Sequence, residues 1–356
     1  MESVVMENLF GRIYKGKNVF ISGNTGFKGS WLALWLQKLG AKVTGYSLPP
    51  HTSPSHFQML NAGYETITGD ILDLNFLKSS FSKIKPDIVF HLAAQSLVRE
   101  SYRDPIKTYQ TNVIGTLNIF ESARVTRSTG AIVNITTDKV YENKENNNAF
   151  REGDALGGHD MYSSSKACSE ILTESYRQSF LGQTEILLAS ARAGNVIGGG
   201  DWGADRLIPD AMKATNESRK VAIRFPESIR PWQHVLEPLC GYLMLGEKLL
   251  QGKKEYASAW NFGPKISDCI AVKEVLGKVS SKWDLVKWEV DKNENPHEAQ
   301  LLILDSSKAQ NRLQWNPVWG LDLTIAKTVE WYREYYENNL LLTEIQLNDY
   351  AALIKK

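Results

Sequence analysis

Short runs of consecutive apolar residues alternate with longer segments of helical apolar spacing through the first half of the chain. After the first run, for example, Trp31, Leu34 and Trp35 recur at the spacing of one helix face. Strands that are apolar throughout must be covered on both faces, and right-handed crossovers between them give a doubly wound sheet. The pattern therefore predicts an α/β fold with a parallel sheet. Its strands are expected at residues 17–22, 42–46, 65–69, 87–92, 131–136 and 185–191, and long helices at 105–124 and 161–180.

The alternation weakens after about residue 192, where glycines gather in 194–203 and prolines punctuate the following segment. A further apolar run at 260–264 has the character of a strand that returns to the sheet. These features predict a larger sheet domain and a smaller C-terminal domain that interleaves with it. The expected division is 1–191 plus about 232–264 for the first, and 192–231 plus about 265–356 for the second. The last residues, 341–356, are expected to form an amphipathic helix that packs on the body or on a partner.

Composition and charge narrow the classes of function. Lysines and arginines number 41 and acids 40, so the chain has no basic excess of the kind that nucleic acid or an anionic membrane attracts. No run of about 18 apolar residues predicts a membrane span, and the acidic N-terminus does not have the form of a secretory signal. The three cysteines, Cys168, Cys240 and Cys269, have neither disulfide-scaffold nor metal-ligand spacing. We expect a cytoplasmic protein without a metal site.

Three glycines, Gly23, Gly26 and Gly29, follow the first predicted strand directly and open the first predicted helix. Such a turn brings backbone N–H groups and the positive end of the helix onto a pyrophosphate. The motif in this context predicts a dinucleotide site on a Rossmann sheet. The residues expected to contact the cofactor are Gly23, Thr25, Gly26, Phe27, Lys28, Gly29, Asp70, Ile71, Leu92, Ala93, Ala94, Gln95, Thr136, Tyr162 and Lys166.

The choice of dinucleotide is less strongly marked. After the second strand the chain reads Gly-Tyr-Ser-Leu-Pro-Pro around Tyr46, with neither the acid that holds an NAD ribose nor an arginine for NADP. NAD is favoured because the arginine is missing. Asp70 could hold the adenine amino group or could instead cap a helix. Residues 92–95 could line the cofactor crevice or could be small residues that simply pack.

Tyr162 and Lys166 are spaced i, i+4 on a predicted helix, so both lie on one face. Beside a nicotinamide, the ammonium would lower the phenol pKa, and Tyr162 could remove a hydroxyl proton as hydride leaves for NAD. Thr137, Asp138 and Lys139 follow the fifth strand, at the edge of the sheet that faces ligand. They offer a hydroxyl, an acid and an amine. The alternative is a turn with an exposed lysine.

Longer strings carry a resemblance. GNTGFKGSWL (23–32) with YSSSK (162–166) resembles the extended short-chain dehydrogenase/reductase family. Within that family, further strings closely resemble the CDP-glucose 4,6-dehydratases. They are LAAQSLVRESY (92–102), TTDKVYEN (136–143), RAGNVIGGGDWGADRLIPD (192–210), RPWQHVLEPL (230–239) and PHEAQLLILDSSKA (296–309). The similarity runs from about Phe10 to about Trp319. It implies a hydro-lyase that converts CDP-D-glucose to CDP-4-dehydro-6-deoxy-D-glucose, a step toward the dideoxy-sugars of bacterial O-antigens.

The resemblance also implies roles. Tyr162 is the base at the sugar C4 hydroxyl, oriented by Lys166 and Thr137, while NAD takes hydride and later returns it to C6. Asp138 is the acid on the C6 hydroxyl. Lys139, where the related dTDP-glucose dehydratases carry glutamate, would be the base at C5 and must then be neutral part of the time. The substrate-binding residues implied are Ser96, Asn195, Arg206, Arg230 and His297.

The family also implies a homodimer or a homotetramer that pairs through the helices beginning near Pro105 and Tyr162. Two other interpretations stay open. One is a nucleotide-sugar 4-epimerase or a dehydratase of a GDP-, UDP- or dTDP-sugar, which would share the glycine turn, Tyr162 and Lys166. The other is an NAD-sensing regulatory protein without catalysis, which would not need the Tyr162–Lys166 pair that this chain retains.

Overall fold

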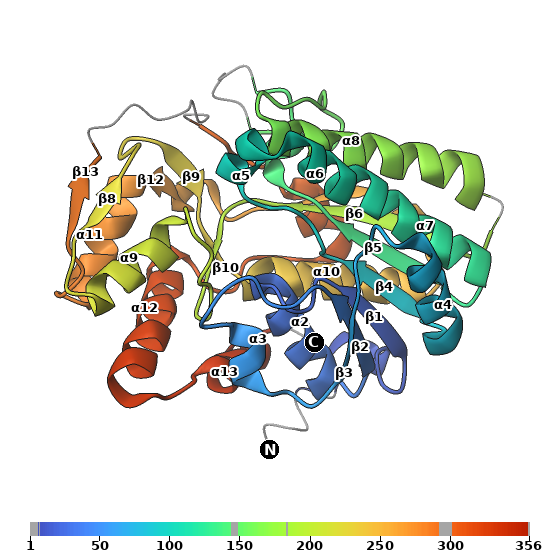
Figure 1. Ribbon diagram of the computed structural model, residues 1–356, viewed down its shortest axis with the longest axis horizontal. Coiled ribbons are helices and arrows are strands. Elements are labelled where there is room, and N and C mark those ends of the chain that lie inside the picture. The colour runs from blue at the N-terminus through green and yellow to red at the C-terminus, as the bar shows by residue number, and fades with distance from the viewer. Residues whose placement is uncertain (1–5, 7, 144–148, 183, 292–300, 355–356) are drawn as a thin grey trace.

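Seven parallel strands form one sheet in the part of the chain that the computed structural model describes, residues 6, 8–143, 149–182, 184–291 and 301–354 (Figure 1). The strand order is β3–β2–β1–β4–β5–β6–β11. Because the order reverses at β1, the carboxyl ends of β1 and β4 flank the crevice in which open α/β sheets bind ligands. The strands are β1 (Asn18–Ser22), β2 (Lys42–Ser47), β3 (Glu65–Thr68), β4 (Ile88–His91), β5 (Ala131–Ile135), β6 (Leu187–Ala193) and β11 (Ala259–Phe262).

The sixth strand lies two residues later than the sequence predicts. Leu187 is the first residue of β6 to pair with β5, and Glu185 is exposed before it. At the other end, β11 pairs with β6 as far as Ala193 and so extends it beyond the predicted end at residue 191. The returning strand expected near residue 260 is therefore confirmed, and it also explains the shifted boundary.

Helices cover both faces of the sheet, as predicted. One face packs against α2 (Phe27–Lys38) and α10 (Leu236–Leu250), and Trp31 and Trp35 of α2 are fully buried there. The opposite face packs against α4 (Leu74–Ile84), α7 (Gly115–Thr126) and the end of α8 (Met161–Tyr176). In Figure 1, α4, α7 and α8 lie on one side of the strands and α2 and α10 on the other.

The helix predicted over 105–124 is interrupted. It consists of α6 (Pro105–Tyr109), a π turn η2 (Gln110–Ile114) and α7. A π turn inserts one extra residue and changes the direction of the side chains near it. Asn112 within this turn is buried, and its amide donates to the Gln95 carbonyl at 3.0 Å and to Ser165 Oγ at 2.9 Å. The interruption thus ties this helix to the loop after β4 and to α8.

A smaller lobe stands beside the sheet, on the left in Figure 1, and has a separate core around Trp202, Trp232 and Trp331. Its helices are α9 (Leu207–Asn216), α11 (Val272–Lys282) and α12 (Leu321–Asn338), and its strand pairs are β8 (Val221–Ile223) with β13 (Trp288–Val290), β9 (Ile229–Pro231) with β12 (Cys269–Ala271), and β7 (Val196–Ile197) with β10 (Gln233–His234). The shorter elements are α3 (His56–Leu60), α5 (Val98–Arg103), η1 (Leu9–Arg12), η3 (Asp138–Val140), η4 (Arg177–Leu181), η5 (Lys254–Tyr256), η6 (Ile266–Asp268) and η7 (Ala309–Leu313).

The C-terminal helix predicted from sequence is α13 (Thr343–Leu353). The division made from sequence assigns residues 265–356 to the smaller domain. Leu347 and Tyr350 of α13 pack instead in the core that contains α2 and α10, and the Tyr350 hydroxyl donates to Glu237 Oε2 at 2.7 Å. The tail therefore packs on the body of the molecule. No helix among the described residues is long and apolar enough to cross a bilayer.

Candidate functional site

A cleft of about 730 Å³ opens between the carboxyl ends of the strands and the smaller lobe. Of the predicted residues, Gln95 does not line it, and His297 lies outside the described residues. The predicted residues that line it are Gly23, Thr25, Gly26, Phe27, Lys28, Gly29, Asp70, Ile71, Leu92, Ala93, Ala94, Ser96, Thr136, Thr137, Asp138, Lys139, Tyr162, Lys166, Asn195, Arg206 and Arg230. Residues far apart in the sequence thus meet in one cavity.

The glycine turn has the shape that a pyrophosphate needs. Gly23 has φ +78°, and a Cβ there would lie 2.7 Å from the backbone nitrogen of Ala93. A Cβ on Gly29 would collide with the carbonyl oxygen of Gly23. Gly26 is the N-cap of α2, so the first N–H groups of that helix lie at the turn. Only glycines allow this close approach, and the residues present therefore fit a dinucleotide phosphate.

The adenosine side of the cleft has no carboxylate directly after β2. Ser47 ends that strand, and its hydroxyl lies 2.8 Å from Thr25 Oγ1. Asp70 lines the cleft, and its Oδ1 accepts from the backbone N–H of Leu72 at 2.9 Å. The alternative role of Asp70 as a helix N-cap is wrong, because Asp73 caps α4. Asp70 instead stabilises the turn that precedes α4 through its bond to Leu72.

Gln95 supports the loop after β4 and does not line the cleft, in contrast to the prediction. Its Nε2 donates to Thr108 Oγ1 at 2.9 Å and to the Leu97 carbonyl at 3.1 Å, and its Oε1 accepts from the Leu97 N–H at 2.6 Å. All the side-chain polar atoms are engaged within the loop and α6. These bonds fix the loop whose neighbouring residues, Ala94 and Ser96, line the cleft.

The predicted catalytic residues form a contiguous group. Tyr162 and Lys166 lie on one face of α8, both buried, and Lys166 Nζ donates to the Ile135 carbonyl at 3.2 Å. Tyr162 hydrogen-bonds to Thr137, and Thr137 Oγ1 in turn donates to Asp138 Oδ1 at 3.0 Å. The helix that carries Tyr162 is fixed by its N-cap, Asp160, which accepts from the Ser163 N–H at 2.8 Å. A phenol, a hydroxyl and a carboxyl are thus connected in the cleft.

Burial dominates the electrostatics of this group. It raises the pKa of Tyr162 to about 12, although the hydrogen bond to Thr137 opposes the shift. It lowers the pKa of Lys166 to about 8, helped by the nearby Lys28 ammonium. The lowered phenol pKa predicted beside a nicotinamide concerns the cofactor complex and stays a prediction. Burial also raises the pKa of Asp138, in spite of Lys139, and favours the protonated form that a proton donor requires.

Two arginines line the part of the cleft that faces the smaller lobe. Arg206, the N-cap of α9, donates from Nη2 to Ser96 Oγ at 3.1 Å and pairs with Asp201. Arg230, in β9, is buried and lies near Asp138. Guanidinium groups can donate two parallel hydrogen bonds and are well suited to phosphate. Asn195, between β6 and β7, lines the same region.

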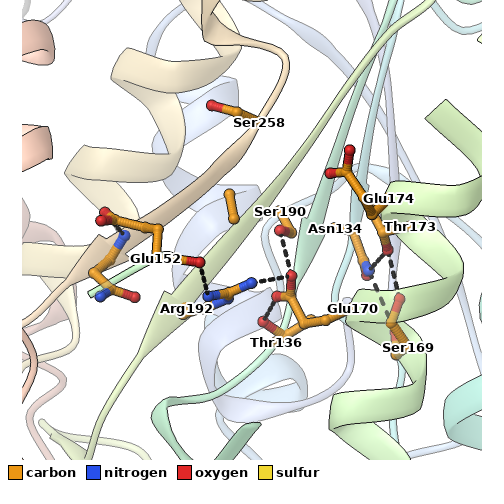
Figure 2. A network of polar contacts seen from close by, with 12 residues as sticks. Asn134, Thr136, Glu152, Ser169, Glu170, Thr173, Glu174, Ser190, Arg192 and Ser258 are labelled. Atoms are coloured by element: carbon orange, nitrogen blue, oxygen red, sulfur yellow. Dashed lines mark hydrogen bonds and ion pairs between the residues drawn. The ribbon is translucent and has the colours of Figure 1, made fainter. Parts of the chain in front are cut away.

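A buried polar network behind the site has no counterpart in the sequence-based prediction (Figure 2). Glu170 of α8 accepts hydrogen bonds from Thr136, from Ser190 Oγ at 2.7 Å and from Arg192 Nη2 at 2.8 Å. The side chains of Glu170 and Arg192 are only 2% and 4% exposed. The signal that could have found Glu170 is its i+4 spacing from Lys166 on the same helix.

The comparisons with known proteins agree with this geometry. The family model described as GDP-mannose 4,6 dehydratase matches residues 20–328. A CDP-glucose 4,6-dehydratase of Salmonella typhimurium is 46% identical over 349 residues, covering 95% of this chain and 97% of that protein.

Two solved structures share the fold. An epimerase of Methanothermobacter thermautotrophicus has TM-score 0.81 at 25% identity and covers 93% of this chain and 96% of its own. A dTDP-glucose 4,6-dehydratase of Bacillus anthracis, in complex with NAD, has TM-score 0.73 at 21% identity and covers 90% and 97%.

Proposed function

Because the chain belongs to the GDP-mannose 4,6-dehydratase family, we propose that it converts CDP-D-glucose to CDP-4-dehydro-6-deoxy-D-glucose and water. The observation that carries this proposal is the 46% sequence identity to a CDP-glucose 4,6-dehydratase, which extends over nearly the whole of both chains. Tyr162, Asp138 and Lys139, which line one cleft, support a dehydratase over an epimerase, since an epimerase has no water to eliminate.

NAD is the proposed cofactor. Gly23, Gly26 and Gly29 would hold its pyrophosphate at the start of α2, and Asp70 lies where the adenosine would extend. Bound there, NAD supplies an acceptor for hydride and later, in the same turnover, a donor. Lys166 lies beside Tyr162 and would bind the nicotinamide ribose.

The side chains of the cleft supply the proton transfers. Tyr162 takes the proton of the C4 hydroxyl, and its hydrogen bond to Thr137 fixes the phenol oxygen. Once C4 is a ketone, the C5 proton is acidic, and Lys139 removes it. Asp138 donates a proton to the C6 hydroxyl, which leaves as water. Lys139 then returns a proton to C5 as hydride reaches C6. Tyr162 now holds one proton more than at the start and Asp138 one fewer. Transfer of that proton through Thr137, which hydrogen-bonds to both, restores the starting protonation state.

The order of groups in the cleft fits these steps. Thr137 contacts both Tyr162 and Asp138, so the oxidation and elimination groups share one hydroxyl. Lys139 is half-buried, directly after Asp138, and its backbone N–H donates to Thr137 Oγ1 at 3.4 Å. When the sugar C4 lies at Tyr162, its C5 and C6 are therefore within reach of Asp138 and Lys139, the two residues that follow Thr137.

We further propose that the enzyme is a cytoplasmic homodimer, with the sugar destined for bacterial surface polysaccharide. Apolar side chains on the outer face of α6, η2 and α8 support the dimer: Ile106, Ile114 and Ile171 are 71%, 48% and 57% exposed. Two copies that pair through these helices would cover them. The same proposal divides the chain into an NAD-binding unit, 1–191 plus about 232–264, on which α13 packs, and a nucleotide-sugar-binding unit, 192–231 plus the rest of about 265–356.

The function is tested with purified protein, NAD and, separately, CDP-, dTDP-, GDP- and UDP-glucose. We expect mass spectrometry to record loss of one water from CDP-glucose. Tyr162→Phe should abolish it, whereas Tyr109→Phe, which removes only a hydroxyl that donates to Ser164 Oγ at 2.8 Å, should retain it. Water loss from a different sugar nucleotide would overturn the assignment of CDP as the nucleotide of the substrate. Inversion at C4 without loss of mass would establish an epimerase instead.

A further inference from the structure

The buried carboxylate of Glu170 connects three elements that carry the site. It lies on α8, one helical turn beyond Lys166, and its oxygens accept from Thr136 at the end of β5 and from Ser190 and Arg192 of β6 (Figure 2). Thr136 is followed directly by Thr137, and Ile135 before it accepts the hydrogen bond of Lys166. Glu170 is thus anchored to the same short segment that Lys166 and Tyr162 contact.

The charges around Lys166 are unevenly arranged. Lys28 of α2 repels its ammonium, and burial disfavours the charge. His91 of β4 also lies close, but burial lowers its pKa to about 3, so the imidazole is neutral at working pH. Glu170 is the acid that acts in the opposite direction. Its own charge is held by Arg192, and Arg177 of η4 lies beyond the pair.

We propose that Glu170 is a positioning residue, which fixes the end of β5 through Thr136 and supplies the negative charge that keeps Lys166 an ammonium. The inference rests on the proposed function, because only there does Lys166 act in the reaction. A structural ion pair that merely held α8 to β6 would need Arg192 but not the hydrogen bond to Thr136. Nor would such a pair be expected to set the charge of a residue in the cleft.

The test compares three variants. Glu170→Gln keeps the shape and removes the charge. Glu174→Gln, one turn further on the same helix, removes an acid whose side chain is 54% exposed and paired with Arg177. Thr136→Val removes the hydroxyl that donates to Glu170 and keeps the charge. Each is measured for kcat and KM between pH 6 and 10 with CDP-glucose and NAD, beside the wild type.

Loss of the Glu170 charge lowers the pKa of Lys166, so the ammonium is lost at lower pH. We expect the alkaline limb of the kcat profile of E170Q to move down by about one pH unit, and that of E174Q to stay in place. We expect T136V to lower kcat without moving the limb. An unmoved limb in folded E170Q would overturn the inference.

If E170Q does not accumulate as folded protein, T136V decides, and wild-type kcat in that variant would overturn the inference. The charge of Lys166 can also be read without turnover, from the ¹³Cε signal that Lys166→Met removes from lysine-labelled protein. That signal should titrate at lower pH in E170Q. A wild-type enzyme that dehydrates none of the sugar nucleotides would instead overturn the proposed function, which separates the two failures.

Discussion

Arg206 donates from one guanidinium nitrogen to both carboxylate oxygens of Asp201, at 3.0 and 2.8 Å. Asp201 is itself fixed, because it is buried and its Oδ1 accepts from the Gly203 N–H at 2.9 Å. The second nitrogen of Arg206 reaches Ser96 on the opposite wall of the cleft. The guanidinium is therefore held in one orientation before any phosphate binds.

Asp201→Asn should raise the KM for the nucleotide sugar about tenfold, with a smaller change in kcat. A hydrogen bond to a charged group contributes about 1.5 kcal/mol, and 1.4 kcal/mol is a tenfold change in affinity. Steady-state kinetics would measure the effect, and Asp284→Asn, an exposed acid outside the cleft, is the control. A KM within twofold of the wild type would show that Asp201 does not orient Arg206.

Gly29→Ala should weaken NAD binding by more than about tenfold, because the added Cβ meets the Gly23 carbonyl and forces the turn open. Gly277→Ala is a matched control in α11, where a Cβ meets nothing within 4 Å and the helix should gain roughly 0.5–1 kcal/mol. Calorimetric titration with NAD measures the first and thermal unfolding the second. Equal NAD affinity in both variants would contradict the role of the turn.

Lys139→Met should separate the two halves of the proposed reaction. Oxidation at C4 does not use Lys139, so absorbance at 340 nm from enzyme-bound NADH should still appear. Release of dehydrated sugar should fall by about 10²–10⁴-fold, as is typical when a general base is removed. Lys83→Met, an exposed lysine on α4, should leave both signals intact. Dehydration at the wild-type rate in K139M would exclude Lys139 as the C5 base.

Glu237 should make the stability of the fold depend on pH. It is fully buried, its oxygens accept from the N–H groups of Val318 and Trp319 and from Tyr350, and burial raises its pKa to about 7. Since this pKa is raised from 4.5, its stabilising contribution is complete below about pH 4.5 and is lost as the pH rises through about 7.

Between pH 5 and 8 the wild type should therefore lose about 2 to 3 kcal/mol of unfolding free energy relative to Glu237→Gln. Urea unfolding at several pH values measures the difference. Glu247→Gln, on the same helix, controls for removal of a carboxyl and should follow the wild-type profile. Parallel profiles for wild type and E237Q would contradict the assignment.

Local patterns predicted which residues meet in the cleft wherever one turn or one helix carries them. Gly23 and Gly29 lie in a single turn, and Tyr162 and Lys166 lie on a single helix face. Thr137 and Asp138 were also predictable, because parallel strands end at a common edge of a sheet.

The features that local patterns did not predict depend on partners distant in the sequence. Glu170 of α8 and Arg192 of β6 are neighbours only because that helix packs beside that strand, and the i+4 spacing from Lys166 is the one local signal of Glu170. Gln95 lies in an irregular loop, where no periodicity fixes the direction of a side chain, and it turns toward Thr108. The pKa of Tyr162 depends on burial, which a motif does not report.

The last strand of the sheet has a consequence for biosynthesis. β6 ends at Ala193, while its neighbour β11 begins only at Ala259, after much of the smaller lobe has been made. During translation, one edge of β6 therefore keeps its backbone N–H and C=O groups unpaired until β11 has been synthesised. An unpaired strand edge can pair with other chains. Translation of residues 194–258 sets the time for which this edge stays open, and slow codons in that stretch would favour aggregation of the nascent enzyme.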